Sequence, residues 1–273
     1  MARAPLVPTF TVGGAPVSIL VDYDGTVSLL DVGDTLLARH VADRAALTEQ
    51  DRRYEEGRIG SRELMLWDMA VLPADAGLLR AEAASIGQDE GLVRLVAIAR
   101  GHGAAVEIVS DGLGFYVEPK LAELGLADLP VVTNENRLEA PGRGMAFPYG
   151  HPRCFVCGTC KRERVRAHQA AHRAVVYIGD GTSDRFAAAH ADVVFAKDSL
   201  ARICRDEGWP YHAWKRLADV ADWLSSALTD GRLPESPDGF DAWRSRYAPG
   251  PRPFICGPEV WGEGRTAPGP GPR

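Results

Sequence analysis

The chain has 273 residues, of which 45% are hydrophobic and 25% are charged, a composition typical of a globular protein with a buried core. Its 31 basic and 37 acidic residues leave a net charge of −6, and no basic stripe marks it as a nucleic-acid-binding protein. No apolar run reaches the roughly 18 to 20 residues that cross a bilayer, and the first ten residues lack the apolar stretch of a signal peptide. We therefore expect a cytoplasmic protein that binds neither nucleic acid nor membrane.

Short apolar runs typical of strands alternate along the chain with segments of helical periodicity. The strand-like runs lie at 18–21, 105–109, 129–132, 175–178 and 193–195, and the helical segments lie at 90–100, 117–124, 164–172 and 183–190. Strands that alternate with helices form a parallel sheet covered on both faces. The sequence therefore predicts an α/β fold whose core is a doubly wound, Rossmann-like parallel sheet of about five strands.

Three intervals interrupt this alternation. Residues 33–86 contain no strand-like run and follow the first strand directly, which predicts an all-helical cap inserted into a core of residues 15–32 and 87–230. Turn residues and cysteines between 134 and 160 predict a small hairpin and a loop. Residues 231–273 hold nine of the 19 prolines in the chain, which predicts an extended C-terminal tail rich in proline and glycine.

Acidic and small residues follow three of the predicted strands at their carboxyl ends, where open parallel sheets bind ligands. These segments are DYDGT at 22–26, SDG at 110–112 and GDGTSD at 179–184. The aspartates that we expect to converge there are Asp22, Asp24, Asp180 and Asp184. Because bare carboxylates repel one another, the cluster predicts a hard cation such as Mg²⁺, which proteins commonly share with a substrate phosphate.

Residues suited to phosphoryl transfer stand at the same strand ends. Asp22 can attack phosphorus to form an aspartyl-phosphate, and Asp24 can protonate the leaving alkoxide and then deprotonate water. Gly25 lets backbone N–H groups approach phosphate oxygens closely. Ser110 and Lys161 can neutralise charge on the transferring phosphoryl group. Together these residues predict hydrolysis of a phosphate monoester.

The same segments, in this order, resemble the four motifs of the haloacid dehalogenase (HAD) superfamily of phosphohydrolases. DYDGT matches its DxDGT motif, Ser110 and Lys161 match the second and third motifs, and GDGTSD matches the fourth. The roles that the resemblance implies are nucleophile for Asp22, acid and base for Asp24, and phosphate clamps for Ser110 and Lys161. The implied Mg²⁺ ligands are Asp22, the backbone carbonyl of Asp24, and Asp180, with Asp184 in support. The helical insert matches the position of the type I cap of this superfamily.

Within the superfamily the chain is similar to the phosphoserine phosphatase-like branch, through its cap position and the segment NENRL at 134–138. It is more similar still to the methionine-salvage phosphatases of 2-hydroxy-3-keto-5-methylthiopentenyl-1-phosphate, through Asp31, GRIGS at 57–61 and CFVCGTCK at 154–161. The implied substrate is a small phosphorylated metabolite, with this methylthio-enol phosphate first. Phosphoserine and an intermediate of a specialised biosynthetic route are the alternatives, because the long C-terminal tail departs from that branch.

A second group of residues is expected to contact the substrate. Its members are Asp31, Gly25, Thr26, Asp111, Gly112 and Arg58. Asp31 could instead cap the helix that begins near Gly33, and Arg58 could be a solvated arginine of the cap. Lys120 is the alternative to Lys161 as the phosphate-binding cation.

Three of the five cysteines lie close together in the sequence, and the odd total argues against a disulfide framework. With His151, the spacing of Cys154, Cys157 and Cys160 suits a structural zinc ion, and reduced thiols without metal are the alternative. A zinc ion there would hold the loop that presents Lys161. A function of another class also stays open, in which the chain is a metal-organised binding protein with a relic HAD core. The sequence does not decide between a monomer and a homodimer.

Overall fold

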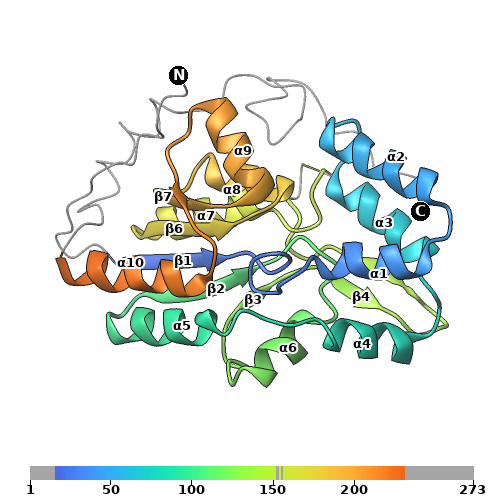
Figure 1. Ribbon diagram of the computed structural model, residues 1–273, viewed down its shortest axis with the longest axis horizontal. Coiled ribbons are helices and arrows are strands. Elements are labelled where there is room, and N and C mark those ends of the chain that lie inside the picture. Colours follow the sequence, from blue (N-terminus) through green and yellow to red (C-terminus); the bar gives the residue numbers. More distant parts are fainter. Residues whose placement is uncertain (1–15, 152–153, 155, 231–273) are drawn as a thin grey trace.

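The computed structural model describes residues 16–151, 154 and 156–230, and the predicted C-terminal tail lies outside these residues. A six-stranded sheet forms the centre of the molecule, in the order β3-β2-β1-β6-β7-β8 (Figure 1). Its strands are β1 (Val17–Val21), β2 (Ala105–Val109), β3 (Val131–Val132), β6 (Ala174–Gly179), β7 (Val193–Ala196) and β8 (His212–Ala213). All neighbouring strands are parallel, which confirms the predicted doubly wound α/β fold. The strand that the sequence missed is β8, because its two residues, His212 and Ala213, do not form an apolar run of the kind that marks β3.

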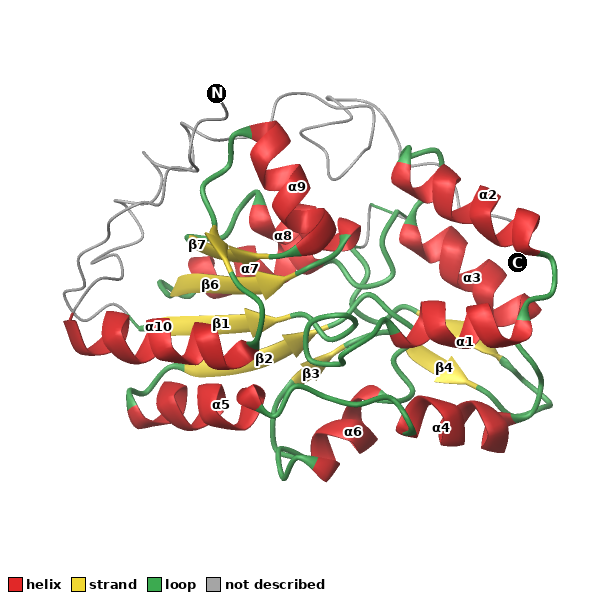
Figure 2. Cartoon of the chain, in the orientation of Figure 1, coloured by secondary structure: helices red, strands yellow, loops and turns green. Residues whose placement is uncertain are grey.

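Helices cover both faces of the sheet (Figure 2). Ile19 and Val21 of β1 join one buried apolar cluster and Leu20 joins the other, because alternate strand residues point to opposite faces. The first cluster includes α5 (Gly91–Gly101), α6 (Val117–Glu123) and α10 (Leu217–Asp230), and the second includes α7 (Lys161–Ala170), α8 (Arg185–Ala188) and α9 (Asp198–Glu207). Within the described residues, the helices are all too short or too polar to cross a membrane.

Four helices lie between β1 and α5, in the interval predicted to form the cap (Figure 1). They are α1 (Val32–His40), α2 (Arg44–Glu55), α3 (Ser61–Val71) and α4 (Ala76–Ala84). Asp31, Asp43 and Asp75 cap α1, α2 and α4 by accepting hydrogen bonds of 2.9 to 3.0 Å from backbone N–H groups of the first turn. The division into a core of residues 15–32 and 87–230 and a cap of residues 33–86 stays a prediction.

A two-stranded antiparallel hairpin follows β3 in the chain. It consists of β4 (Glu135–Arg137) and β5 (Gly144–Ala146), and β5 packs against α3 of the cap. The hairpin lies in the interval 134–160, where turn residues predict one.

The strand register brings the residues that follow each strand to one edge of the sheet. Val21, the last residue of β1, pairs with Ile108 of β2 and Ile178 of β6. Asp22 continues this pairing, because its backbone N–H donates to the Ile178 carbonyl at 2.9 Å. Asp22 and Ser110 therefore leave the sheet close to each other and to the GDGTSD segment after β6.

Candidate active site

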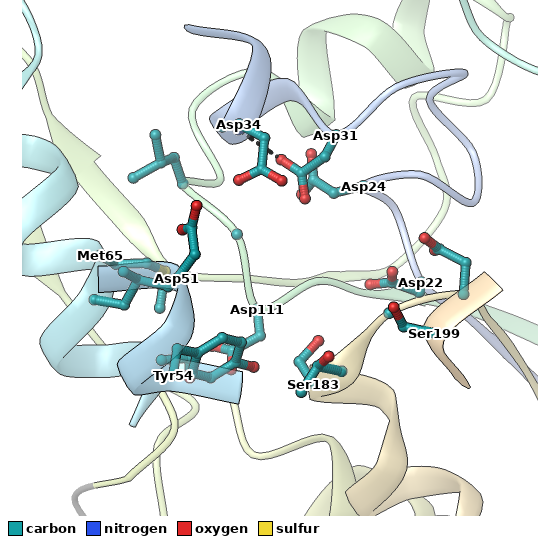
Figure 3. A pocket seen from close by; sticks show the side chains of 18 of the residues that line it. Asp22, Asp24, Asp31, Asp34, Asp51, Tyr54, Met65, Asp111, Ser183 and Ser199 are labelled. Carbon is teal, nitrogen blue, oxygen red and sulfur yellow. Dashed lines mark hydrogen bonds between the residues drawn. The ribbon is translucent and has the colours of Figure 1, made fainter. Parts of the chain in front are cut away.

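A cavity of about 370 Å³ lies at this edge of the sheet, between the strand ends and the cap helices. Figure 3 shows Asp22 on one side of it and Asp51, Tyr54 and Met65, from α2 and α3, on the other. The predicted site residues that line the cavity are Asp22, Asp24, Asp31, Asp111, Gly112, Lys161 and Asp180. The structure therefore brings residues from widely separated segments of the chain to one cavity.

Lys161 is the cation that the structure places in the cavity. It is the first residue of α7, and its buried Nζ donates to Asp22 Oδ1 at 2.5 Å and to Asp184 Oδ1 at 2.6 Å. Burial opposes its charge, but Asp184 and Asp22 raise the pKa of Lys161 well above its ordinary value, so it stays charged. The alternative cation, Lys120, lies elsewhere and donates to the Ala84 carbonyl and to Glu123.

Asp184 holds this part of the site in position. It is fully buried, and its Oδ1 accepts from Lys161 and from the Tyr177 hydroxyl at 2.5 Å. Its Oδ2 accepts from the backbone N–H groups of Asp180 and Gly181, each at 2.9 Å. Four donors fix the carboxylate and the start of the loop after β6.

Three carboxylates are close enough to hold one metal ion. Asp22, Asp180 and Asp184 can each offer an oxygen within 4.8 Å of the others. Burial, and then the negative charge of Asp184, raises the pKa of Asp22 well above its ordinary value and that of Asp180 to about 7. A hard divalent cation relieves this repulsion, so the residues present fit the predicted Mg²⁺. Because Asp184 already has four donors, Asp22 and Asp180 are the carboxylates best able to bind it.

Gly25 and Thr26 act on Asp180 from the first motif. Thr26 Oγ1 donates to Asp180 Oδ1 at 2.6 Å. Gly25 has a φ of +73°, and a Cβ there would lie 2.3 Å from Asp180 Oδ2. Only glycine therefore allows both the turn and the close approach of Asp180. Neither residue lines the cavity among the residues described, so their expected contact with substrate stays a prediction.

Asp24 has the surroundings of a group that exchanges protons near neutral pH. Its Oδ1 accepts from the Tyr116 hydroxyl at 2.8 Å and from the Val32 backbone at 3.2 Å, and its Oδ2 accepts from Ser110 Oγ at 3.3 Å. Burial raises its pKa to about 6, and these hydrogen bonds limit the rise. A carboxyl with this pKa can give a proton and take it back near neutral pH. A Cβ at Gly112 would lie 2.3 Å from Asp24 Oδ2, so the small residue there leaves room for it.

Asp111 links the cap to the loop before α7. Its carboxylate accepts from Ser61 Oγ at 2.5 Å, from the Thr159 backbone at 2.7 Å and from Asn134 Nδ2 at 3.3 Å. Ser61 is the first residue of α3, and Thr159 lies two residues before Lys161. Asp111 lines the cavity, but its oxygens are already occupied by protein donors. The geometry points to a positioning role.

The two other predicted substrate contacts, Asp31 and Arg58, differ in their position relative to the cavity. Asp31 lines the cavity and also caps α1, and its contact with substrate stays a prediction. The Arg58 side chain is 45% exposed and forms ion pairs with Glu49 at 3.3 Å and Glu56 at 2.8 Å. The residues that line the described part of the cavity do not include Arg58.

The three neighbouring cysteines are buried. Among the described residues, Asp22, Asp180 and Asp184 form the one group of three or more side chains close enough to share a metal ion. The cysteine thiols do not form such a group, so the zinc prediction has no support there. Burial raises the pKa of Cys160 to about 11, which keeps this thiol protonated at neutral pH.

Sequence reasoning missed several polar residues of the site. Tyr116 and Tyr177 donate to Asp24 and Asp184, but a buried tyrosine in an apolar run carries no signal of that role. Four acidic residues of the cap also line the cavity: Asp34, Asp51, Glu55 and Asp68. In the sequence they stand among charged neighbours and look like part of a solvated helix face.

Comparison with known proteins agrees with this geometry. The family of haloacid dehalogenase-like hydrolases matches the chain over residues 19–189. A relative from Exiguobacterium sibiricum, named 2-hydroxy-3-keto-5-methylthiopentenyl-1-phosphate phosphatase, is 26% identical over 223 residues, covering 77% of this chain and 97% of its own. A relative of the same name from Brevibacillus brevis is 30% identical over 132 residues, covering 48% of this chain and 60% of its own.

Solved structures show the same fold. The phospho-aspartyl intermediate analogue of phosphoserine phosphatase matches with a TM-score of 0.57 and 18% identity, covering 77% of this chain and 99% of that chain. A substrate-bound phosphoserine phosphatase complex matches with a TM-score of 0.57 and 16% identity over the same shares of the two chains. The resemblance predicted from the motifs is confirmed.

Proposed function

The chain belongs to the haloacid dehalogenase-like hydrolase family and is a phosphatase, and from this premise we propose that it hydrolyses a small phosphate monoester through an aspartyl-phosphate, with Mg²⁺. One observation carries the proposal. Asp22 follows β1, accepts a hydrogen bond from the Lys161 ammonium and belongs to the group of carboxylates that can hold a metal ion, and the proton-exchanging Asp24 lines the same cavity.

In the first step, an Asp22 oxygen attacks phosphorus while the bond from phosphorus to the alcohol oxygen breaks. Asp24 gives its proton to that oxygen, so a neutral alcohol leaves and Asp24 becomes a carboxylate. The Lys161 ammonium, held between Asp22 and Asp184, stabilises negative charge at the reacting group.

In the second step, Asp24 takes a proton from a water molecule as the water oxygen attacks phosphorus. The bond between phosphorus and Asp22 breaks, inorganic phosphate leaves, and both aspartates return to their starting forms. Mg²⁺ bound by Asp22 and Asp180 would supply positive charge that draws the substrate phosphate into place. The cap helices exclude bulk water from these steps.

The names of the relatives supply candidate substrates. The methylthio-enol phosphate of methionine salvage is the first, because relatives named for that activity align with 77% of this chain at 26% identity. Phosphoserine is the second, supported by the likeness in fold. The alternative of a binding protein with a relic core is not retained, because the chain is a family phosphatase and its four motif segments meet at the site.

The proposal is tested by phosphate release from purified protein. The panel contains the methylthio-enol phosphate, phosphoserine and p-nitrophenyl phosphate, each assayed with Mg²⁺ and with excess chelator. We expect turnover with Mg²⁺, a loss of at least about 100-fold on chelation, and recovery when Mg²⁺ is restored. Turnover that chelation leaves unchanged would refute the metal, and no turnover of any ester would refute the proposal.

A further inference from the structure

The charge balance of the cavity is strongly uneven. Among the described residues, ten carboxylates line it and Lys161 is the one cation, already held by Asp22 and Asp184. Of the six carboxylates outside the cap helices, those of Asp24, Asp31 and Asp111 accept hydrogen bonds from protein donors. Asp22 and Asp180 belong to the metal group, and Asp198 is the first residue of α9. The cap side carries Asp34 from α1, Asp51 and Glu55 from α2, and Asp68 from α3, which we call the cap acid cluster.

The arginines of the cap do not neutralise this cluster. Arg52 and Arg53 stand next to Asp51 in α2, but they form ion pairs with Glu49 at 2.6 Å and Glu63 at 3.2 Å. These partners do not line the described part of the cavity. The part of the chain that the structure describes therefore offers the cap acid cluster no ion-pair partner within 4.0 Å.

Asp68 supplies a second, independent observation. It lines the cavity, the residue is only 6% exposed, and its buried Oδ1 has no hydrogen-bond partner among the described residues. Burial, and then the charges of Asp34 and Asp51, raises its pKa to about 8. A buried carboxyl oxygen without a donor destabilises the folded state, and a donor from a ligand in the cavity would relieve this cost.

The chemistry of the wall narrows what this donor can be. Within the described residues, the cap acid cluster does not bring three carboxylate oxygens close enough for one metal ion. An ammonium group on a flexible stem fits better, because it offers three donors and a positive charge. Leu64, Met65 and Tyr54 line the same side and suit the carbon chain of such a ligand. A ligand carboxylate would be repelled there.

We propose that the cap acid cluster binds a cationic group on the leaving alcohol, so that the preferred substrates are phosphate monoesters of small amino alcohols. This inference rests on the proposed phosphatase reaction. The organic part of the substrate that it names differs from that of the substrate for which the relatives are named. The phosphate lies against Asp22 and Lys161, and the ammonium lies against Asp68 and its neighbours across the cavity. Phosphoserine fits less well than its analogue without the carboxylate, phosphoethanolamine.

The test compares ω-aminoalkyl phosphates of two to five carbons with ω-hydroxyalkyl phosphates of the same lengths, in Mg²⁺ at pH 8.5, above the raised pKa of Asp68. The two series differ only in the terminal ammonium or hydroxyl group. We expect kcat/KM for the best amine to exceed that of its hydroxyl counterpart at least about tenfold. Equal values, or a preference for the hydroxyl, would overturn the inference.

Three variants locate the source of the preference. Asp68→Asn and the exposed Asp51→Asn are each expected to lower the ratio of amine to hydroxyl kcat/KM about five- to tenfold, mainly through KM of the amine. Asp222→Asn is the matched control, because it removes one carboxylate charge at a side chain that is 64% exposed and outside the described cavity lining. An equal fall of the ratio in Asp222→Asn would overturn the inference.

The same assays separate the two proposals. Turnover of hydroxyalkyl and p-nitrophenyl phosphates without any advantage for the amine refutes the inference alone. No release of phosphate from any ester refutes the proposed reaction, and the inference is refuted with it. If Asp68→Asn does not fold, Asp51→Asn decides the assignment.

Discussion

The two sides of the cavity use the same side chain in opposite ways. On the sheet side, Asp24 and Asp111 each accept three hydrogen bonds, and their positions are set by these donors. On the cap side, Asp68 keeps a buried oxygen without any described donor. A fully bonded carboxylate serves a fixed chemical step, whereas one that lacks partners is available to a ligand. In our proposal, the sheet side therefore carries out the reaction and the cap side recognises the organic part of the substrate.

The largest effect is expected from the sheet side. Asp22→Asn removes the nucleophile and is expected to lower turnover at least about a thousandfold, because an amide cannot form the aspartyl-phosphate. Phosphate release and a thermal melt are measured together, and we expect the fold to persist because Asp184 still holds Lys161. Asp222→Asn, at an exposed side chain paired with Arg94 outside the cavity, is the control. Full activity of Asp22→Asn would end the assignment of this side to the reaction.

Asp24→Asn tests whether Asp24 acts as the acid that protonates the leaving group. We expect kcat/KM for alkyl phosphates to fall about 100- to 10,000-fold, because the leaving alkoxide no longer receives a proton. The loss should be much smaller for the first step with p-nitrophenyl phosphate, since nitrophenolate leaves without a proton. Burst-phase kinetics with both esters measure this difference. Equal losses in the first step for the two leaving groups would contradict the acid role.

On the cap side we expect a smaller effect, which is a gain in stability and not a loss of activity. The pKa of Asp68 is raised to about 8 in the folded state from about 4 in the unfolded chain. Between these values the folded state holds a proton that the unfolded chain has lost, so the group makes folding less favourable as pH rises through this window. Asp68→Asn removes this titration. We expect it to raise the free energy of unfolding by about 1 to 3 kcal/mol at pH 8.

Chemical denaturation of wild type and Asp68→Asn at pH 5 and pH 8 measures that effect. The gain should grow with pH, since both proteins carry a neutral group at this position under acidic conditions. A gain that does not depend on pH would mean that the carboxyl ionises normally in the folded state. Asp68 would then carry no greater energetic cost than the hydrogen-bonded carboxylates of the sheet side.

The smallest effect is expected from Arg58→Ala. Arg58 is exposed and ion-paired with Glu49 and Glu56, so its loss should change kcat/KM less than about twofold and stability by less than about 0.5 kcal/mol. Steady-state kinetics on the alkyl phosphates measure this. A tenfold rise in KM would indicate that Arg58 contacts the substrate and that the cap side contributes a cation to the site.

Much of the sheet side could be predicted because the topology leaves little choice. Residues that follow parallel strands must meet at the same edge, so DYDGT, Ser110 and GDGTSD could be placed together from strand order alone. Of the two candidate cations, Lys161 lies in the described cavity lining and Lys120 does not. Tyr116 could not be predicted, because its contact with Asp24 depends on how the loop before α6 folds.

The cap side could not be predicted for a related reason. Asp51, Arg52, Arg53 and Glu55 follow closely in one polar helix, and the periodicity does not say which of them face the cavity. Arg58 forms ion pairs with Glu49 and Glu56, and its contact with substrate stays a prediction. Which of these side chains face the cavity depends on the packing of α2 against α3 and of α3 against β5 of the hairpin.

The sequence by itself determined the fold class and the meeting of the motif segments at one edge of the sheet, because strand periodicity and the residues at strand ends are local properties that a parallel sheet brings together in only one way. The tertiary structure alone decided the charge of the cavity wall on the cap side. That charge depends on the rotation of each cap helix, which distant apolar contacts set and local sequence does not.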